Sequence, residues 1–321
     1  MDIYQIFHPR LEKYYPLVSS LLEGDLSIEF LESFFKPEIA KEIMHLNEKF
    51  FCSNSTRSCG NPGFVHSLRT MIWIVALGGN EETKLLALYH DILEDFGKSS
   101  EDLEKEFSQI PNSIASDCLA LTNRHSLLIK ELEKIPKQQE HLDSLSSSEI
   151  LADVAKETSK DLPKRTLVDL KRDSYEKYLQ LLKDVIYETG NERILMVKLA
   201  DRLDNTLADW PSKFRSLVKI YSKNSMTLEA YKDLVLNGFA SAQTKLLYIM
   251  LIERSLNQIR FLITNYGVLV EKRGLFYGQQ YQKLKDILLE EQYKLLPFES
   301  VKSELLSQES LQKFLEQFKI N

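Results

Sequence analysis

The sequence contains few of the residues that break helices or cross-link chains. Of its 321 residues only 11 are glycine and 9 are proline, and a chain so poor in helix breakers favours long helices over a turn-rich β fold. The three cysteines are too few for a disulfide framework or a cysteine-based zinc site; they are Cys52, Cys59 and Cys118. We therefore expect an all-α protein of the cytoplasm, with its cysteines in the reduced state.

The chain also lacks long apolar runs and an excess of positive charge. Its longest apolar stretch, Leu246–Ile252, is far shorter than the roughly 20 residues that span a bilayer. Residues 1–16 show no basic start followed by an apolar run, so we expect no signal peptide. With 41 Lys+Arg against 47 Asp+Glu, the net charge is −6, which argues against a general nucleic-acid binder. We expect neither a membrane nor a nucleic acid as partner.

Hydrophobic residues make up 43% of the chain, enough for a packed core, and their spacing is helical almost throughout. Residues 52–63 are polar and aperiodic and predict a loop, after which residues 64–77 predict an apolar helix. Asn80 is placed to cap the next helix, which we expect to run to about Phe96. Trp73 is expected in the core.

The chain divides by composition into three parts. We expect an N-terminal helical segment at 1–45, a core at 46–208 and a helical C-terminal extension at 209–321. Residues 125–172 are polar and charged and predict an insertion within the core. Two further helices are expected at 173–189 and 192–208, on either side of Gly190 and Asn191.

The helix that begins at Asn80 ends in an unusual set of side chains. The string YHDILEDFG holds His90, Asp91, Glu94 and Asp95. On a continuous helix, residues four apart share a face. Carboxylates in a last helical turn lie at the negative end of the helix dipole, which disfavours them, and a metal ion would offset that cost. The alternative is a solvated acidic helix end with an incidental histidine.

Two other segments could complete a metal site. His66 lies in the first turn of the preceding helix, and Asp201 shares a helix face with Asn205. Two imidazoles and two carboxylates suit manganese, iron or zinc. They could converge only if the helix end points His90 and Asp91 into the same cleft. We call these four ligand candidates the His–Asp cluster: His66, His90, Asp91 and Asp201.

Three motifs follow one another in the chain: RSCGNPGFVH at 57–66, HDILED at 90–95 and KLADRLDN at 198–205. In this order they resemble the motifs of the HD-domain metal-dependent phosphohydrolases, most of all the RelA/SpoT-type (p)ppGpp hydrolase domain and its small stand-alone relatives. The resemblance implies an HD-domain helical bundle, here with an internal insertion and a C-terminal extension. It also implies hydrolysis of the 3′-pyrophosphate of (p)ppGpp.

The resemblance assigns roles position by position. It makes the His–Asp cluster the metal ligands, usually for manganese in this family, although another divalent ion remains open. Glu94 and Asp95 would position and activate the attacking water, and Arg57 would lie against the guanine base. Asn205 would sit beside ribose or phosphates. For Lys198 and Arg202 two roles stay open, contact with phosphate or pairing with nearby acids.

Two other functions remain open. The chain departs from the family pattern at Gly63, Ser67 and Phe96, and the interval from Asp91 to Asp201 is long. The first alternative is an HD phosphohydrolase that acts on another nucleotide or phosphoester. The second is a non-catalytic nucleotide sensor whose C-terminal helices dock a protein partner. No synthetase-like region follows the hydrolase motifs, so we do not expect a bifunctional enzyme.

Overall fold

The computed structural model describes residues 11–50, 63–93, 112–123, 167–207, 214–255 and 258, and the structural statements that follow concern these residues. Every regular element among them is a helix and none is a strand, which confirms the all-α expectation. The helices are α2 (Tyr15–Glu23), α3 (Ile28–Glu32), α4 (Pro37–Phe50), α5 (Gly63–Ala76), α6 (Glu81–Tyr89), α9 (Asn112–Leu121), α12 (Leu167–Thr189), α13 (Glu192–Leu207) and α14 (Phe214–Leu236). Residues 242–255 are also helical.

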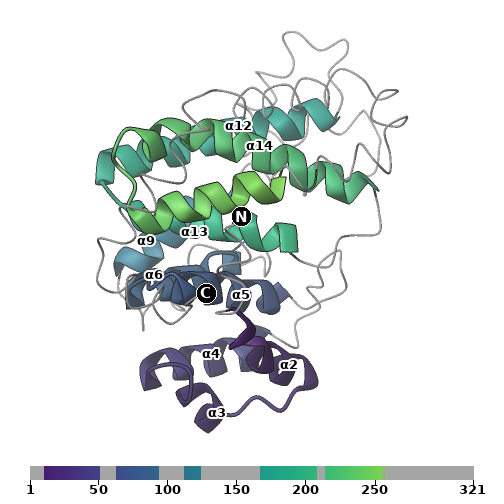
Figure 1. The fold of residues 1–321 in the computed structure, drawn as a ribbon, viewed down its shortest axis with the longest axis vertical. Helices are drawn as coiled ribbons and strands as arrows, with labels where there is room; N and C mark the ends of the chain where they lie inside the picture. Colours follow the sequence, from purple (N-terminus) through teal and green to yellow (C-terminus); the bar gives the residue numbers. More distant parts are fainter. Residues whose placement is uncertain are drawn as a thin grey trace, which may run out of the picture.

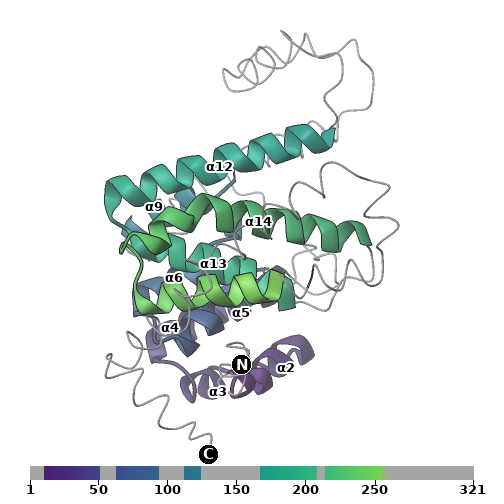
Figure 2. The ribbon, with the colours of Figure 1, turned by 45° about the horizontal axis from the view of Figure 1, so that its top comes forward.

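The helices lie in successive layers, with the purple helices α2, α3 and α4 at one end (Figure 1). Helices α5 and α6 form the next layer and pack against each other and against α13. The helix at 242–255 lies alongside α13, and α12 and α14 pack together at the far end (Figure 1, Figure 2). The middle of the molecule is therefore built by α5, α6 and α13, which hold or adjoin the described parts of the three sequence motifs.

Helix α5 is central because nearly every side chain along it is buried, including Trp73 at 2% exposure. The Gly78-Gly79 pair ends it for two separate reasons. Gly78 adopts a left-handed conformation (φ 76°) that side chains disfavour. A Cβ on Gly79 would lie 2.3 Å from Cγ2 of Ile74, so only glycine fits there.

Helix α6 begins as the sequence predicts and ends earlier. The Asn80 side chain accepts a hydrogen bond from the Thr83 backbone N–H at 2.9 Å, which confirms the cap. The prediction of one helix to about Phe96 is wrong: α6 ends at Tyr89, His90 and Asp91 form a turn, and helix resumes only at 92–93.

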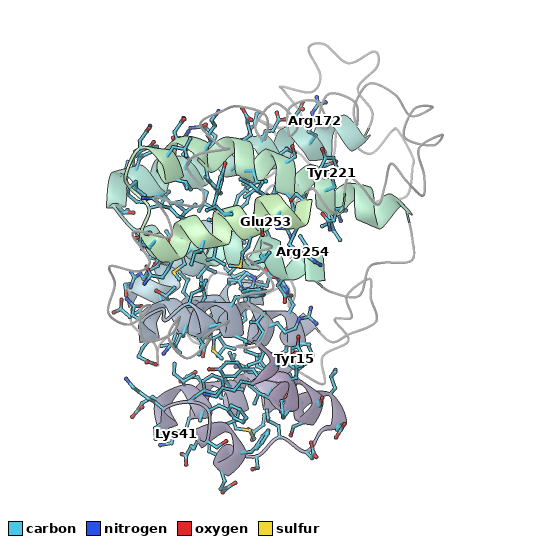
Figure 3. The ribbon with its side chains drawn as sticks, in the orientation of Figure 1. Tyr15, Lys41, Arg172, Tyr221, Glu253 and Arg254 are labelled. Atoms are coloured by element: carbon cyan, nitrogen blue, oxygen red, sulfur yellow. The ribbon has the colours of Figure 1, made fainter. Side chains whose placement is uncertain are left out.

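The later helices match the predicted boundaries closely. Helices α12 and α13 end and begin on either side of Gly190 and Asn191, but α12 starts at Leu167, inside the segment that we expected to be an insertion. Arg254 lies on the helix at 242–255 (Figure 3). Its Nη2 donates to the carbonyl of Thr206 at 3.4 Å. This contact ties the helix at 242–255 to the end of α13. Among the described residues, no helix is both long and apolar enough to cross a membrane.

Candidate metal centre

His66 lies one turn into α5, and its side chain is 1% exposed. Its two ring nitrogens face different carboxylates. Nδ1 is 2.6 Å from Oδ2 of Asp204, whereas Nε2 is 3.1 Å from Oδ1 of Asp201 and 3.4 Å from Oδ2 of Asp91. The Nε2 side of the ring therefore points to the predicted site.

His90 and Asp91 occupy the turn at the end of α6. Nδ1 of His90 donates to the carbonyl of Ala87 at 2.7 Å, which leaves Nε2 facing the two aspartates. That nitrogen is 3.3 Å from Oδ1 of Asp91 and 4.0 Å from Oδ1 of Asp201. The adjacent side chains of His90 and Asp91 therefore converge at the end of α6, which the sequence alone could not establish.

Asp201 in α13 uses its two oxygens differently. Oδ1 faces the two imidazoles and accepts a hydrogen bond from Nδ2 of Asn205 at 2.7 Å, so the predicted common face is confirmed. Oδ2 lies 3.0 Å from Nζ of Lys198 and 3.4 Å from Nε of Arg202. Both cations therefore pair with this acid, which is one of the two roles that the sequence left open. Contact with phosphate remains a prediction.

The four members of the His–Asp cluster each offer one ligand atom, and these atoms all lie within 4.8 Å of one another. Bonds from a metal ion to nitrogen or oxygen are about 2.0–2.2 Å long, so ligands on opposite sides of one ion lie about 4.2 Å apart. Small inward rotations of the side chains would bring the cluster to that spacing. Nε2 of His90 is buried and makes no hydrogen bond. These donors fit a divalent cation.

The charges of the cluster perturb its protonation. Burial disfavours the charged form of His90, but the carboxylates of Asp91 and Asp201 outweigh burial and raise its pKa to about 9. Burial would raise the pKa of Asp201, yet Arg202, Lys198 and His66 hold it well below its usual range. The pKa of Asp91 is lowered in the same way, chiefly by His90. In the metal-free protein the cluster is a compact set of imidazole and carboxylate charges.

The sequence interpretation missed two residues beside the cluster. Asp204 is buried and accepts from Nδ1 of His66, and the guanidinium of Arg69 binds both of its oxygens. Nε of Arg69 donates to Oδ1 at 2.9 Å and Nη2 donates to Oδ2 at 3.0 Å. Each residue lies three positions after a predicted ligand, Asp204 after Asp201 and Arg69 after His66. This i, i+3 spacing places each residue on the same helix face as that ligand. The spacing is the feature of the sequence from which the two residues could have been predicted.

Other predicted residues lie outside the described part of the chain. Arg57, Glu94 and Asp95 are among them, so their assigned roles stay predictions. The same holds for residues 125–166 of the expected insertion.

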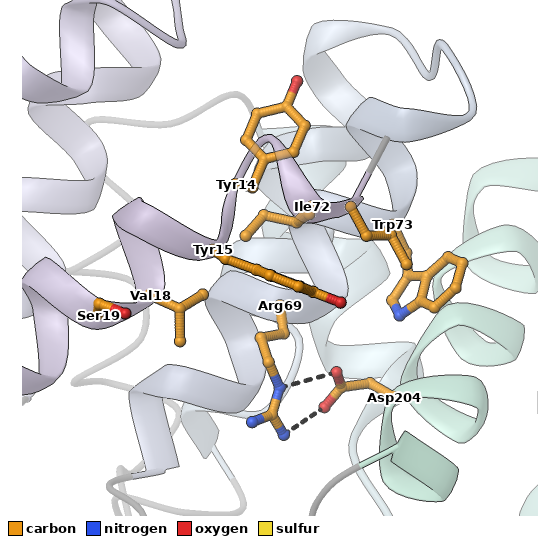
Figure 4. Close-up of a pocket in the computed structure, with 9 residues that line it drawn as sticks. Tyr14, Tyr15, Val18, Ser19, Arg69, Ile72, Trp73 and Asp204 are labelled. Carbon is orange, nitrogen blue, oxygen red and sulfur yellow. Dashed lines mark hydrogen bonds and ion pairs between the residues drawn. The ribbon is translucent and has the colours of Figure 1, made fainter. Parts of the chain in front are cut away.

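A cavity of about 400 Å³ lies on the other side of His66, between α2, α5 and α13. The Arg69–Asp204 pair forms one wall of it, and Trp73 and Tyr15 lie nearby (Figure 4). The ligand atoms of the cluster do not line this cavity. It is therefore distinct from the candidate metal centre, although Asp204 touches both.

Comparison with known proteins gives a consistent but distant relationship. Over 215 residues, 66% of this chain, it is 26% identical to the guanosine-3′,5′-bis(diphosphate) 3′-pyrophosphohydrolase of Aquifex aeolicus, and the match covers 23% of that protein. Over 278 residues, 84% of this chain, it is 23% identical to a probable enzyme of the same name from Mycoplasma genitalium, and the match covers 32% of it. No protein-family model matches the chain. No solved structure matches it significantly.

These matches confirm the resemblance that the motifs indicated: the chain is distantly similar to (p)ppGpp 3′-pyrophosphohydrolases. It spans between about a quarter and a third of the length of these relatives. The buried His–Asp cluster is consistent with an HD-type site, and it suggests a divalent metal ion without identifying which one.

Proposed function

We propose that this chain is a metal-dependent phosphohydrolase that removes pyrophosphate from the 3′ position of (p)ppGpp, a small guanine nucleotide of the cytoplasm. The observation that carries the proposal is the convergence of the His–Asp cluster from α5, from the turn that follows α6 and from α13. The distant relatives supply the substrate, because both are named for this reaction. Because the chain covers only part of their length, its activity as a separate protein is part of the proposal.

In the proposed mechanism the cluster would hold the ion, with manganese the expected one. A divalent cation there would supply a water of lowered pKa and neutralise charge on phosphate oxygens. The two Nε2 atoms and two carboxylate oxygens would bind it. Lys198 and Arg202 balance the charge of Asp201, so the buried site does not carry uncompensated negative charge.

The remaining steps fall to residues that the resemblance assigned. Glu94 follows Asp91 by three positions, and we propose that it accepts a proton from the attacking water with Asp95 beside it. Arg57 would stack on guanine. Asn205, whose amide already binds Asp201, would orient ribose or phosphate next to the ion. The products would be GDP or GTP and pyrophosphate.

The test is to incubate the purified protein with ppGpp and a panel of other nucleotides, with Mn²⁺ or with chelator, and to resolve the products. We expect pyrophosphate from ppGpp with Mn²⁺ only. Asp91→Ala should abolish it by removing a ligand, and Glu94→Ala should abolish it while sparing Mn²⁺ binding. His45→Ala, at an exposed position on α4, is the matched control and should leave it unchanged.

The other outcomes each identify a different function. Turnover of another nucleotide alone would refute the alarmone substrate and leave an HD phosphohydrolase of different specificity. Tight nucleotide binding without turnover would favour the sensor. Absence of any metal-dependent turnover or binding would refute the proposal.

A further inference from the structure

A second layer of side chains lies behind His66, on the side away from the metal centre. Asp204 is 1% exposed, and its Oδ2 contacts Nδ1 of His66 at 2.6 Å. Arg69 binds the same carboxylate through two parallel N–H groups at 2.9 and 3.0 Å (Figure 4). Two-point pairing of this kind fixes the direction of a carboxylate as well as its charge.

The geometry requires a proton on Nδ1 of His66. A carboxylate that receives two guanidinium N–H groups is ionised and can only accept hydrogen bonds. Nδ1 of His66 must therefore be the donor in the 2.6 Å contact. When the ring is neutral its lone pair is then on Nε2, which faces Asp91 and Asp201. Nothing on the metal side enforces this choice, because carboxylates also surround Nε2.

His90 reaches the same state by a simpler route, since its Nδ1 donates to the backbone carbonyl of Ala87. A backbone carbonyl is fixed by the helix, whereas the Asp204 side chain can rotate. A side-chain acceptor needs a support of its own, and Arg69 is placed to provide it. Both residues lie on the same two helices as the ligands they adjoin, Arg69 on α5 and Asp204 on α13.

We propose that Arg69 and Asp204 form a positioning clamp that holds His66 with Nδ1 protonated and Nε2 directed at the metal ion. Asp204 fixes the ring, and Arg69 fixes Asp204. Neither residue touches the ion, so both are positioning residues. The clamp deepens the proposed function, because it rests on the same metal centre. Partners of this kind behind a metal-bound histidine typically change metal affinity by about 10–100-fold when removed.

A purely structural role is the competing explanation, since the pair also ties α5 to α13. The chain offers a matched control for that role. Arg193 of α13 pairs with the buried Asp117 of α9 at 3.1 Å, another Arg–Asp contact that ties two helices together. Asp117→Asn removes this ion pair between two helices and should lower the free energy of unfolding. It should leave the protonation of His66 and the Mn²⁺ affinity unchanged.

The experiment compares the full chain with Asp204→Asn, Asp117→Asn, and the double variant Asp204→Asn with Arg69→Gln. Two readouts are made on each: ¹⁵N–¹H NMR of the imidazoles in metal-free protein, and Mn²⁺ affinity by electron paramagnetic resonance. In Asp204→Asn an N–H₂ group replaces one carboxylate oxygen, so the side chain can no longer receive Nε–H and Nη2–H of Arg69 on two separate oxygens and loses its two-point anchor. We expect the Nε2–H form of His66 to appear and Mn²⁺ affinity to fall about 10–100-fold.

The double variant is the rescue. The introduced asparagine can accept from His66 through its side-chain oxygen while its amide N–H donates to the side-chain oxygen of the introduced glutamine. The Nδ1–H form and most of the lost affinity should therefore return. The clamp is wrong if Asp204→Asn keeps the Nδ1–H form and an affinity within about threefold of wild type, or if Asp117→Asn changes both readouts equally.

The two proposals fail in different ways. If the wild-type chain binds no Mn²⁺, the proposed function loses its metal centre, and the NMR readout still decides the clamp. If Asp204→Asn does not fold, the wild-type and double-variant spectra decide it, because the clamp requires Nδ1–H in both.

Discussion

Binding of a metal ion to His90 should release a proton, and its strength should therefore depend on pH. The side chain of His90 is 3% exposed, and neighbouring Asp91 and Asp201 outweigh burial and raise its pKa to about 9. In the metal-free protein at neutral pH this imidazole is protonated. Because the Nδ1 proton is held by the Ala87 carbonyl, the ion and the second proton compete for Nε2.

The size of the effect follows from the pKa. Each pH unit below a pKa of about 9 should weaken the apparent Mn²⁺ affinity about tenfold. At pH 7 the competition amounts to about 100-fold, or about 2.7 kcal/mol. The same shift has a consequence for stability: metal-free protein should be most stabilised by His90 below pH 6.5 and should lose that stabilisation as pH rises toward 9.

Isothermal titration calorimetry with Mn²⁺ at pH 6.5, 7.5 and 8.5 measures how the Mn²⁺ affinity depends on pH. Repeating it in two buffers of different ionisation enthalpy counts the protons released, and we expect about one per ion at pH 7.5. His45→Gln replaces an exposed histidine on α4. We expect this control variant to show the same Mn²⁺ affinity and proton release as the wild type at each pH. An affinity that is flat from pH 6.5 to 8.5, with no proton release, would refute this explanation of His90.

Three further predictions concern stability, measured by urea denaturation of metal-free protein. Asp201→Asn leaves Lys198 and Arg202 buried beside a neutral amide, so the free energy of unfolding should fall by about 3–5 kcal/mol; a loss under about 1 kcal/mol would show that the two cations find other partners. Trp73→Ala empties a site that is 2% exposed, and we expect a loss of about 3–5 kcal/mol, whereas a near-neutral result would contradict its place in the core. Asn80→Ala removes the cap of α6 and should cost about 1 kcal/mol, with Asn80→Ser close to wild type; equal losses in both variants would argue against a capping role.

Local patterns in the sequence predicted the elements that local chemistry controls. Asn80 caps α6 because a short polar side chain can accept from the next turn. Gly190 and Asn191 separate α12 from α13 as expected. Helical periodicity was sufficient to predict an all-α fold, since few breakers interrupt it.

The site was harder to predict because it depends on contacts between distant segments. The order of the motifs indicated which side chains could meet, and the structure brings the His–Asp cluster together. The end of α6 at Tyr89 was missed, because no breaker residue marks it in the sequence. Asp204 and Arg69 were missed because their pairing joins residues 135 positions apart.

The central claim is that one divalent ion binds the His–Asp cluster. Anomalous diffraction at the manganese edge, from crystals grown with Mn²⁺, tests it most directly. We predict a single strong peak about 2.0–2.3 Å from Nε2 of His66, Nε2 of His90 and one oxygen each of Asp91 and Asp201. A peak elsewhere, or none at the cluster while its four side chains are well ordered, would contradict the claim.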